Sequence, residues 1–363
     1  EISSFTTFES FFEAYKQQEK AMIRLLVNAI NAVDSAHAAR CPLPFQSSMV
    51  DDCMERGKCV QQGGAHYNFS GPQGFGIANM TDALLAIREL VYRTHRYTLQ
   101  DFREALELNF GRGLPERLAV EMTVRVVTDL TLSGRALKEE DIRAIHDRLL
   151  RDGATTDEQR RRFAQMLSDI DSVPHYGNDI EEVDLFAREV AYTYTREIEK
   201  YRNYRGGQFQ AGLYPVSANV PLGAQTGATP DGRLACTPIA DGVGPMSGRD
   251  RKGPTAAANS VAKLDHAIAS NGTLFNQKFH PSALAGMDGL SKFVALIRGF
   301  FDQKGMHMQF NVVSRETLID AQKHPEKYKS LVVRVAGYSA LFTTLSKSLQ
   351  DDIISRTEQA WGR

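Results

Sequence analysis

Cysteine thiols are the residues best suited to nucleophilic, redox or metal chemistry, and the chain of 363 residues has four of them: Cys41, Cys53, Cys59 and Cys236. None belongs to a CxxC pair, and their spacing is not that of a zinc site. On a helix, Cys53 and Glu55 would point about 200° apart, which argues against a catalytic pair. These thiols are therefore interpreted as reduced side chains of an intracellular protein.

Two other patterns invite a functional interpretation but do not support one. His66, His266, His280 and His307 are scattered without HxxxH spacing, so each is interpreted as a packed or hydrogen-bonding side chain. Residues 71–76 (GPQGFG) are rich in glycine, but they lack the GxGxxG order of a dinucleotide-binding turn. We therefore expect no metal site and no bound nucleotide cofactor.

The most informative segment lies near the C-terminus, where residues 332–342 read VVRVAGYSALF. An apolar strand ends at Gly337, and Tyr338 and Ser339 follow it. Taken alone, the segment predicts a strand-to-loop turn at which glycine supplies a positive φ.

Residues 334–339 (RVAGYS) resemble the signature of the glycyl radical enzymes, which include pyruvate formate-lyase, choline trimethylamine-lyase and the glycerol and 1,2-propanediol dehydratases. The resemblance continues in the right order along nearly the whole chain. The further segments that carry it are residues 63–73, 205–207, 212–217, 227–233, 240–243 and 309–313. Residues 253–256 and 271–276 are most similar to the glycerol and propanediol dehydratase branch.

This resemblance implies that Gly337 carries a protein-derived radical installed by an S-adenosylmethionine-dependent activating enzyme. Elementary chemistry agrees, because glycine has an α-hydrogen to lose and no Cβ to prevent planarity at the radical carbon. The flanking amide nitrogen and carbonyl share the unpaired electron, and an apolar strand leading in helps to exclude water. In the family the radical passes to a cysteine, whose thiyl takes a hydrogen atom from the substrate before a neighbouring group leaves.

The family's catalytic cysteine has no counterpart in this chain. In dehydratase-like members it stands in a Gly-Cys-x-Glu context, whereas the four cysteines here follow Arg40, Asp52, Lys58 and Ala235. The sequence also starts at Glu1 without a methionine. We therefore expect the chain to be the C-terminal portion of a longer enzyme, inactive alone, whose N-terminal half carries the cysteine and its neighbouring glutamate.

The resemblance also implies a substrate class. Tyr214 matches a position that lines the substrate pocket, although a packed loop aromatic would fit equally well. Gln210 is neutral, which favours a small polyol such as glycerol or 1,2-propanediol as the substrate that loses water. Arg205 and Arg233 are candidate anion partners or structural arginines, so a C–N or C–S lyase acting on choline or a sulfonate stays an alternative.

Two alternatives come from other functional classes. One is a non-catalytic spare part that supplies Gly337 to a damaged enzyme, and the other is an α/β ligand-binding domain. Spare parts resemble only the C-terminal end of the family, whereas the match here includes residues 41–76. The lyase is therefore the favoured interpretation.

Hydrophobic periodicity predicts the elements that position these residues. The first third is helical, with helices near 80–94 and 98–109 for which Thr81 and Thr98 are candidate N-caps. Further helices are expected within 115–172 and over 179–201. Residues 205–254 hold 10 of the 28 glycines and 6 of the 13 prolines, which indicates long functional loops rather than helix.

The last hundred residues alternate between strands and helices. Strands are expected at 273–279, 306–313 and 330–336, and helices at 288–302, 315–323 and 345–360, in the order typical of parallel α/β structure. The resemblance adds a ten-stranded barrel of two half-barrels, with Gly337 on a loop at its centre and this chain giving the C-terminal half. Residues 1–204 would be the mainly helical part and residues 205–363 the glycine-radical domain.

Composition excludes several classes of protein. Lys plus Arg number 43 and Asp plus Glu 44, so the net charge of −1 argues against a bulk electrostatic nucleic-acid binder. No apolar run approaches the ~18 residues of a membrane span. We expect a cytoplasmic protein, and the resemblance implies a homodimer.

Overall fold

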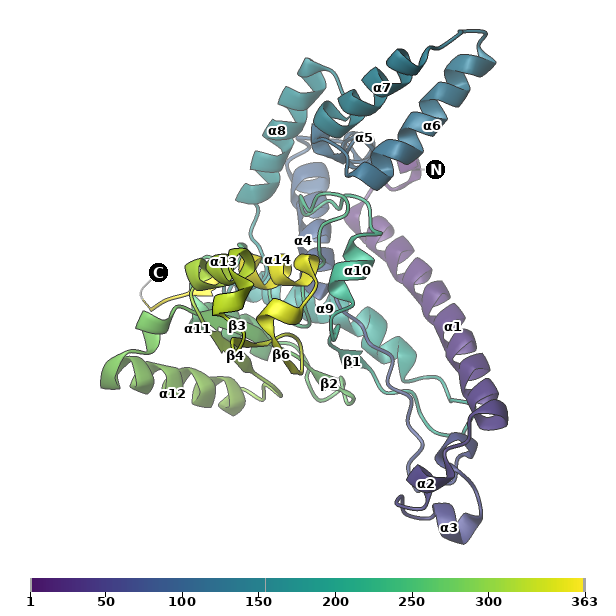
Figure 1. Ribbon diagram of the computed structural model, residues 1–363, viewed down its shortest axis with the longest axis vertical. Helices are drawn as coiled ribbons and strands as arrows, with labels where there is room; N and C mark the ends of the chain where they lie inside the picture. The colour runs from purple at the N-terminus through teal and green to yellow at the C-terminus, as the bar shows by residue number, and fades with distance from the viewer. Residues whose placement is uncertain (1, 154, 362–363) are drawn as a thin grey trace. The chain divides into compact units, whose positions relative to one another are not determined.

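The computed structural model describes residues 2–153 and 155–361 (Figure 1). The chain forms two compact units, each built from separate stretches of sequence. The first unit comprises Glu1–Phe8, Asn79–His175 and Ala218–Ile239. The second comprises Glu9–Ala78, Tyr176–Ser217 and Ala240–Arg363.

The first unit is helical. Its elements are η1 (Ile2–Ser4), most of α4 (Ile77–Ile87), a π-helical turn (Arg88–Arg93), α5 (Leu99–Glu107), η4 (Asn109–Gly111), α6 (Glu116–Leu132), α7 (Glu139–Asp152), α8 (Asp157–Ser172) and α10 (Asn219–Gly223). Figure 1 shows α6 and α7 as a helical hairpin. The helices expected within 115–172 are confirmed as α6, α7 and α8.

Of the two expected N-caps in this unit, one is confirmed and one is wrong. Thr98 caps α5, since its hydroxyl accepts the Asp101 N–H at 3.1 Å and its own N–H donates to the Asp101 carboxylate at 2.8 Å. Thr81 is instead fully buried inside α4. That helix begins four residues earlier because the apolar pattern extends back to Ile77, directly after Gly76 in a left-handed conformation.

The second unit combines helices with short strands. Its helices are α1 (Phe8–Arg40), α2 (Pro44–Ser47), α3 (Cys53–Arg56), η2 (Val60–Gln62), α9 (Glu181–Ile198), α11 (Pro254–Ala262), η5 (Pro281–Leu284), α12 (Gly286–Asp302), α13 (Arg315–Lys323), η6 (Pro325–Lys327), η7 (Phe342–Thr344) and α14 (Lys347–Ser355). Its strands are β1 (Gly212–Leu213), β2 (Gly272–Thr273), β3 (Asn276–Phe279), β4 (Gln309–Val312), β5 (Val332–Arg334), β6 (Ser339–Leu341) and β7 (Glu358–Gln359). The unit therefore has the expected α/β character.

The strands are parallel except in the last hairpin. The order β4-β3-β7 forms a parallel sheet, β1 pairs with β2 in parallel, and β5 pairs with β6 antiparallel. The expected strand over 273–279 is divided, because its first part pairs with β1 and its second part with β4 and β7. The helix expected over 345–360 ends at Ser355, since the chain then extends to add β7 to the sheet.

An aromatic cluster fixes this sheet against α12. Phe279 of β3 lies 5.6 Å from Phe293 of α12 and 5.4 Å from Trp361, measured between ring centroids. Phe310 of β4 packs on Phe293 at 4.5 Å. The opposite faces of β3 and β4 are left to polar side chains, because successive residues of a strand point to opposite sides.

The Gly- and Pro-rich stretch is mostly loop, as expected. Within residues 205–253 the regular elements are β1 and the five-residue helix α10. None of the helices in the described part of the chain is long and apolar enough to cross a membrane.

Candidate active site

Gly337 lies at the turn between β5 and β6. Its φ is +86°, a left-handed conformation that residues with a side chain rarely adopt. The turn is closed by the N–H of Val335, which donates to the carbonyl of Tyr338 at 2.9 Å. Val335 and Ala336 are buried, whereas Gly337 and Tyr338 are exposed in this chain.

Two side chains of β4 hold this hairpin. The Asn311 amide makes a pair of bonds to the Arg334 backbone, accepting its N–H and donating to its carbonyl, both at 2.8 Å. The Gln309 carbonyl oxygen accepts the N–H of Gly337 at 3.2 Å and the Arg334 guanidinium at 2.9 Å. The side chains of β4 thus supply the partners that a further strand would otherwise give to β5.

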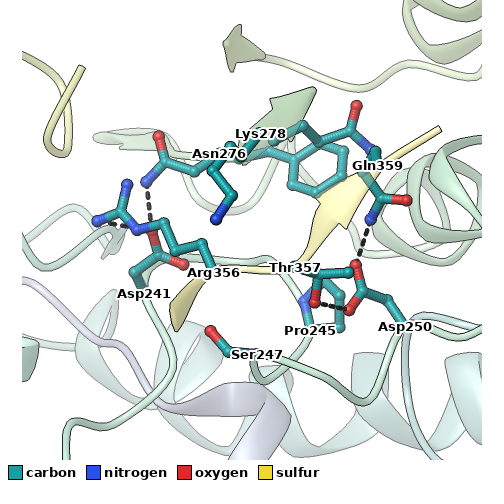
Figure 2. A pocket seen from close by; sticks show the side chains of 11 residues that line it. Asp241, Pro245, Ser247, Asp250, Asn276, Lys278, Arg356, Thr357 and Gln359 are labelled. Carbon is teal, nitrogen blue, oxygen red and sulfur yellow. Dashed lines mark hydrogen bonds and ion pairs between the residues drawn. The ribbon is translucent and has the colours of Figure 1, made fainter. Parts of the chain in front are cut away.

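A buried charged group holds the other side of the turn. Arg356 donates to the Val335 carbonyl at 2.8 Å and lies 3.0 Å from Asp352 and 3.4 Å from Asp241. Asn276 donates to Asp241 and also to the Val335 carbonyl, the latter at 3.3 Å. Figure 2 shows Asn276 and Arg356 converging on Asp241. Because these ion pairs are buried, removing one partner would leave the charge of the other buried without compensation.

Asp241, Asn276 and Arg356 line one side of a cavity of about 30 Å³, which has room for about one water molecule. On its other side Asp250 accepts hydrogen bonds from Thr357 and, at 2.5 Å, from Gln359 (Figure 2). Burial raises the pKa of Asp250 to about 6. Burial lowers the pKa of Lys278 to about 8, and its ammonium donates to the Ile354 carbonyl at 2.9 Å.

Tyr214 directly follows β1, and its hydroxyl donates to the Asn271 side chain at 2.5 Å. Asn271 lies at the entry of β2, three residues before Leu274. A Cβ on Gly337 would lie 3.5 Å from the Leu274 side chain. The residues on either side of β2 therefore lie near the two predicted site residues, Asn271 against Tyr214 and Leu274 beside Gly337.

A close approach explains one motif glycine near Tyr214. A Cβ on Gly71 would lie 2.1 Å from the Asn271 side-chain nitrogen, so a side chain there would displace the partner of Tyr214. The motif around residues 63–73 is thereby connected in space to the motif around residues 212–217.

The two candidate anion-binding arginines have structural roles. Arg205 donates to the Phe69 carbonyl at 2.8 Å and to Ser70 at 3.0 Å, and it pairs with Asp34. Arg233 is 2% exposed and donates to the loop carbonyls of Leu234, Thr237 and Gly227. Both guanidinium groups are therefore used to hold the Gly-rich loops together.

The cysteines and one histidine are the remaining candidates for chemistry. Cys53 is buried, Cys41 is exposed, and all four cysteines are free thiols. Among the described residues, His280, Glu316 and Glu358 place ligand-type atoms within 4.8 Å of one another. His280 Nδ1 already accepts the Ser282 N–H at 3.2 Å, and Glu358 accepts the Arg315 N–H at 2.7 Å, so both contribute to local structure.

Sequence comparison identifies the family. Residues 1–223 match the model of the pyruvate formate lyase-like family, and residues 239–343, which include Gly337, match that of the glycine radical domain. The chain belongs to the glycyl radical enzyme family. The family predicted from the sequence motifs is thereby confirmed.

Three relatives show how the glycyl radical enzymes match this chain. The probable dehydratase YbiW of Escherichia coli K12 is 38% identical over 98% of this chain and 39% of its own length. A structure describing 1,2-propanediol dehydration in Roseburia inulinivorans is 60% identical, with a TM-score of 0.90 over 98% of this chain and 42% of that one. The glycerol-bound B12-independent glycerol dehydratase of Clostridium butyricum is 46% identical, with a TM-score of 0.83 over 99% and 39%. The chain thus spans about two fifths of each relative.

In the sequence, Gln309 and Asp241 stand out only as members of the segments that carry the family resemblance, and Arg356 does not stand out at all. One signal was available for Gln309, because Gln309 and Asn311 are polar at alternate positions of an otherwise apolar strand. That alternation places both on one face of β4. Arg356 had no local signal, since its partners come from other parts of the sequence.

Proposed function

We propose that this chain is the C-terminal part of a glycyl radical dehydratase that eliminates water from a small neutral polyol such as 1,2-propanediol or glycerol. The observation that carries the substrate is the 60% identity, along 98% of the chain, with the structure that describes 1,2-propanediol dehydration. The structural roles of Arg205 and Arg233 support it, because both guanidinium groups already bind loop carbonyls and Arg205 also pairs with Asp34.

In this proposal Gly337 stores the radical and Tyr214 lines the substrate pocket. An S-adenosylmethionine-dependent activating enzyme removes a hydrogen atom from the Gly337 Cα. A cysteine in the N-terminal half then gives its thiol hydrogen to Gly337 and takes one from a substrate carbon. A glutamate beside that cysteine is the base, water leaves from the neighbouring carbon, and the return of hydrogen yields an aldehyde.

The N-terminal half is the proposed partner that completes the ten-stranded barrel, with residues 1–204 and 205–363 as the helical and radical parts of this chain. The surface of α1 supports such a partner. Met22, Leu25 and Val33, which recur at helical spacing, are 63%, 60% and 52% exposed. The whole enzyme is proposed to be a cytoplasmic homodimer.

The test has two parts. The coding region upstream of Glu1 is expected to contain an in-frame Gly-Cys-x-Glu, and a nearby start codon without it would instead support the spare part. The complete protein, activated anaerobically, is expected to convert 1,2-propanediol to propionaldehyde with a glycyl radical signal in electron paramagnetic resonance. A radical signal with no turnover of 1,2-propanediol or glycerol would refute the substrate assignment, and no signal would refute the enzyme class.

A further inference from the structure

The side-chain amide of Gln309 binds the backbone N–H of Gly337 directly. Its oxygen lies 3.2 Å from the Gly337 amide nitrogen and accepts that N–H. The same oxygen accepts the Arg334 guanidinium at 2.9 Å, and the side-chain nitrogen donates to the Asn276 oxygen. All polar atoms of this side chain are therefore engaged, and Gln309 is only 6% exposed.

The orientation of this amide is determined by its neighbours. Arg334 can only donate, so the group that faces it must be the oxygen of Gln309. The nitrogen then faces Asn276, whose own nitrogen is directed to Asp241 and to the Val335 carbonyl. A chain of hydrogen bonds thus runs from the buried Asp241–Arg356 pair to the backbone of Gly337.

We propose that Gln309 is the positioning residue of the radical glycine, fixing through the Gly337 N–H the direction in which the Gly337 Cα–H bond points. The inference rests on the proposed function. Glycine has no side chain to limit rotation about its N–Cα bond, so the φ of +86° depends on hydrogen bonds. The Val335–Tyr338 bond closes the turn, and the bond to Gln309 is the restraint on the Gly337 N–H itself.

The step that depends on this restraint is hydrogen transfer. A cysteine S–H bond breaks as a Cα–H bond forms at the Gly337 radical, and the unpaired electron passes to sulfur. On return the S–H bond forms and the Cα–H bond breaks. Atom transfer of this kind needs the reacting atoms in contact and aligned, and a displacement of about 1 Å can cost ~100-fold in rate.

The experiment compares turnover per radical in the complete, activated enzyme. Electron paramagnetic resonance gives the number of glycyl radicals per enzyme, and the rate of diol turnover is divided by that number. Gln309→Met removes the acceptor and is expected to lower kcat per radical at least tenfold, with KM for the diol within about twofold of the wild type. Gln309→Glu keeps an oxygen toward Gly337 and Arg334 but loses the donor to the Asn276 oxygen, so it is expected to regain part of that loss.

Asn311→Ala is the matched control, because it loosens the same hairpin three residues away from Gly337 without touching it. It is expected to lower the thermal midpoint about as much as Gln309→Met while changing kcat per radical less than threefold. If Gln309→Met does not fold, Gln309→Asn withdraws the oxygen by one methylene and is expected to lose turnover in the same way.

Three results would overturn the inference. These are a normal kcat per radical in Gln309→Met or Gln309→Asn, a Gln309→Glu as impaired as Gln309→Met, or an Asn311→Ala as impaired as either. The failure of the proposed function gives a different result, since the wild type itself would then lack the radical or the turnover.

Discussion

Two hairpins, α6–α7 and β5–β6, each turn at a left-handed glycine, but the surroundings of the two glycines differ. Gly134 follows α6 with a φ of +85°, and Gly337 connects β5 to β6 with a φ of +86°. A Cβ on Gly134 would meet nothing within 4 Å, whereas one on Gly337 would contact Leu274. The conformation of the glycine is therefore common to both turns, and the surroundings distinguish the candidate radical site.

Charge is also used differently in the two regions. On α7, Arg143 pairs with Glu139 with both side chains more than three-quarters exposed. Behind the β5–β6 turn, Arg356 pairs with Asp241 and Asp352 with all three side chains at most 13% exposed. Exposed pairs contribute little to stability, whereas breaking a buried pair leaves an uncompensated charge. The region around Gly337 is thus the one that should respond strongly to substitution.

The largest effect is expected from Gly337→Ala, with Gly134→Ala as its matched control. Each alanine would be held in the left-handed region at a cost of about 1–2 kcal/mol, so both variants should lose similar stability and keep the fold. Only Gly337→Ala should abolish the radical in the complete, activated enzyme, because alanine has a Cβ that opposes a planar radical carbon. Electron paramagnetic resonance measures the signal, and a radical of normal intensity in Gly337→Ala would contradict the assignment.

Arg356→Met tests the contrast in charge. Removing the guanidinium leaves Asp241 and Asp352 buried without it, which should lower the free energy of unfolding by about 3–5 kcal/mol. Arg143→Met on α7 should cost less than about 1 kcal/mol. Urea unfolding followed by circular dichroism gives both values. Equal losses in the two variants would remove the distinction between the regions.

Asp250→Asn tests how the stability of the buried region depends on pH. Burial raises the pKa of Asp250 from 3.8 to about 6, so its contribution to stability is complete below about pH 4 and is lost as the pH rises through 6. At about 1.4 kcal/mol per pH unit over the roughly two units between these values, the wild type should lose about 2–3 kcal/mol relative to Asp250→Asn between pH 4 and pH 7. Unfolding both proteins at the two pH values gives this difference, and a difference independent of pH would refute it.

The smallest effect on stability is expected from Tyr214→Phe. Losing the hydrogen bond to Asn271 should cost about 1 kcal/mol. If Tyr214 lines the pocket, kcat/KM of the complete enzyme for 1,2-propanediol should also fall about tenfold. The exposed Tyr204→Phe provides the control, and matching kinetics in the two variants would show that Tyr214 is only a packed loop residue.

Much of the helical structure could be predicted locally. The pattern predicts a helix over the residues that form α13, and Thr98 caps α5 as predicted. Such features depend on residues three or four positions apart, so a short window of sequence contains their cause. The division of the strand over 273–279 could not be predicted in this way. Its two parts pair with different strands, β1 and β4, which lie far away in the sequence.

The amino-acid sequence by itself determined the family and the candidate radical residue, since residues 334–339 and the motifs around them are specific enough to be recognised in order. The tertiary structure decided what holds that residue. Gln309, Asn276, Asp241 and Arg356 come from four distant stretches and meet only when β3, β4 and the C-terminal segment are in register. Hydrogen bonds depend on distances of about 3 Å, and only the folded backbone brings residues so far apart in sequence within that range.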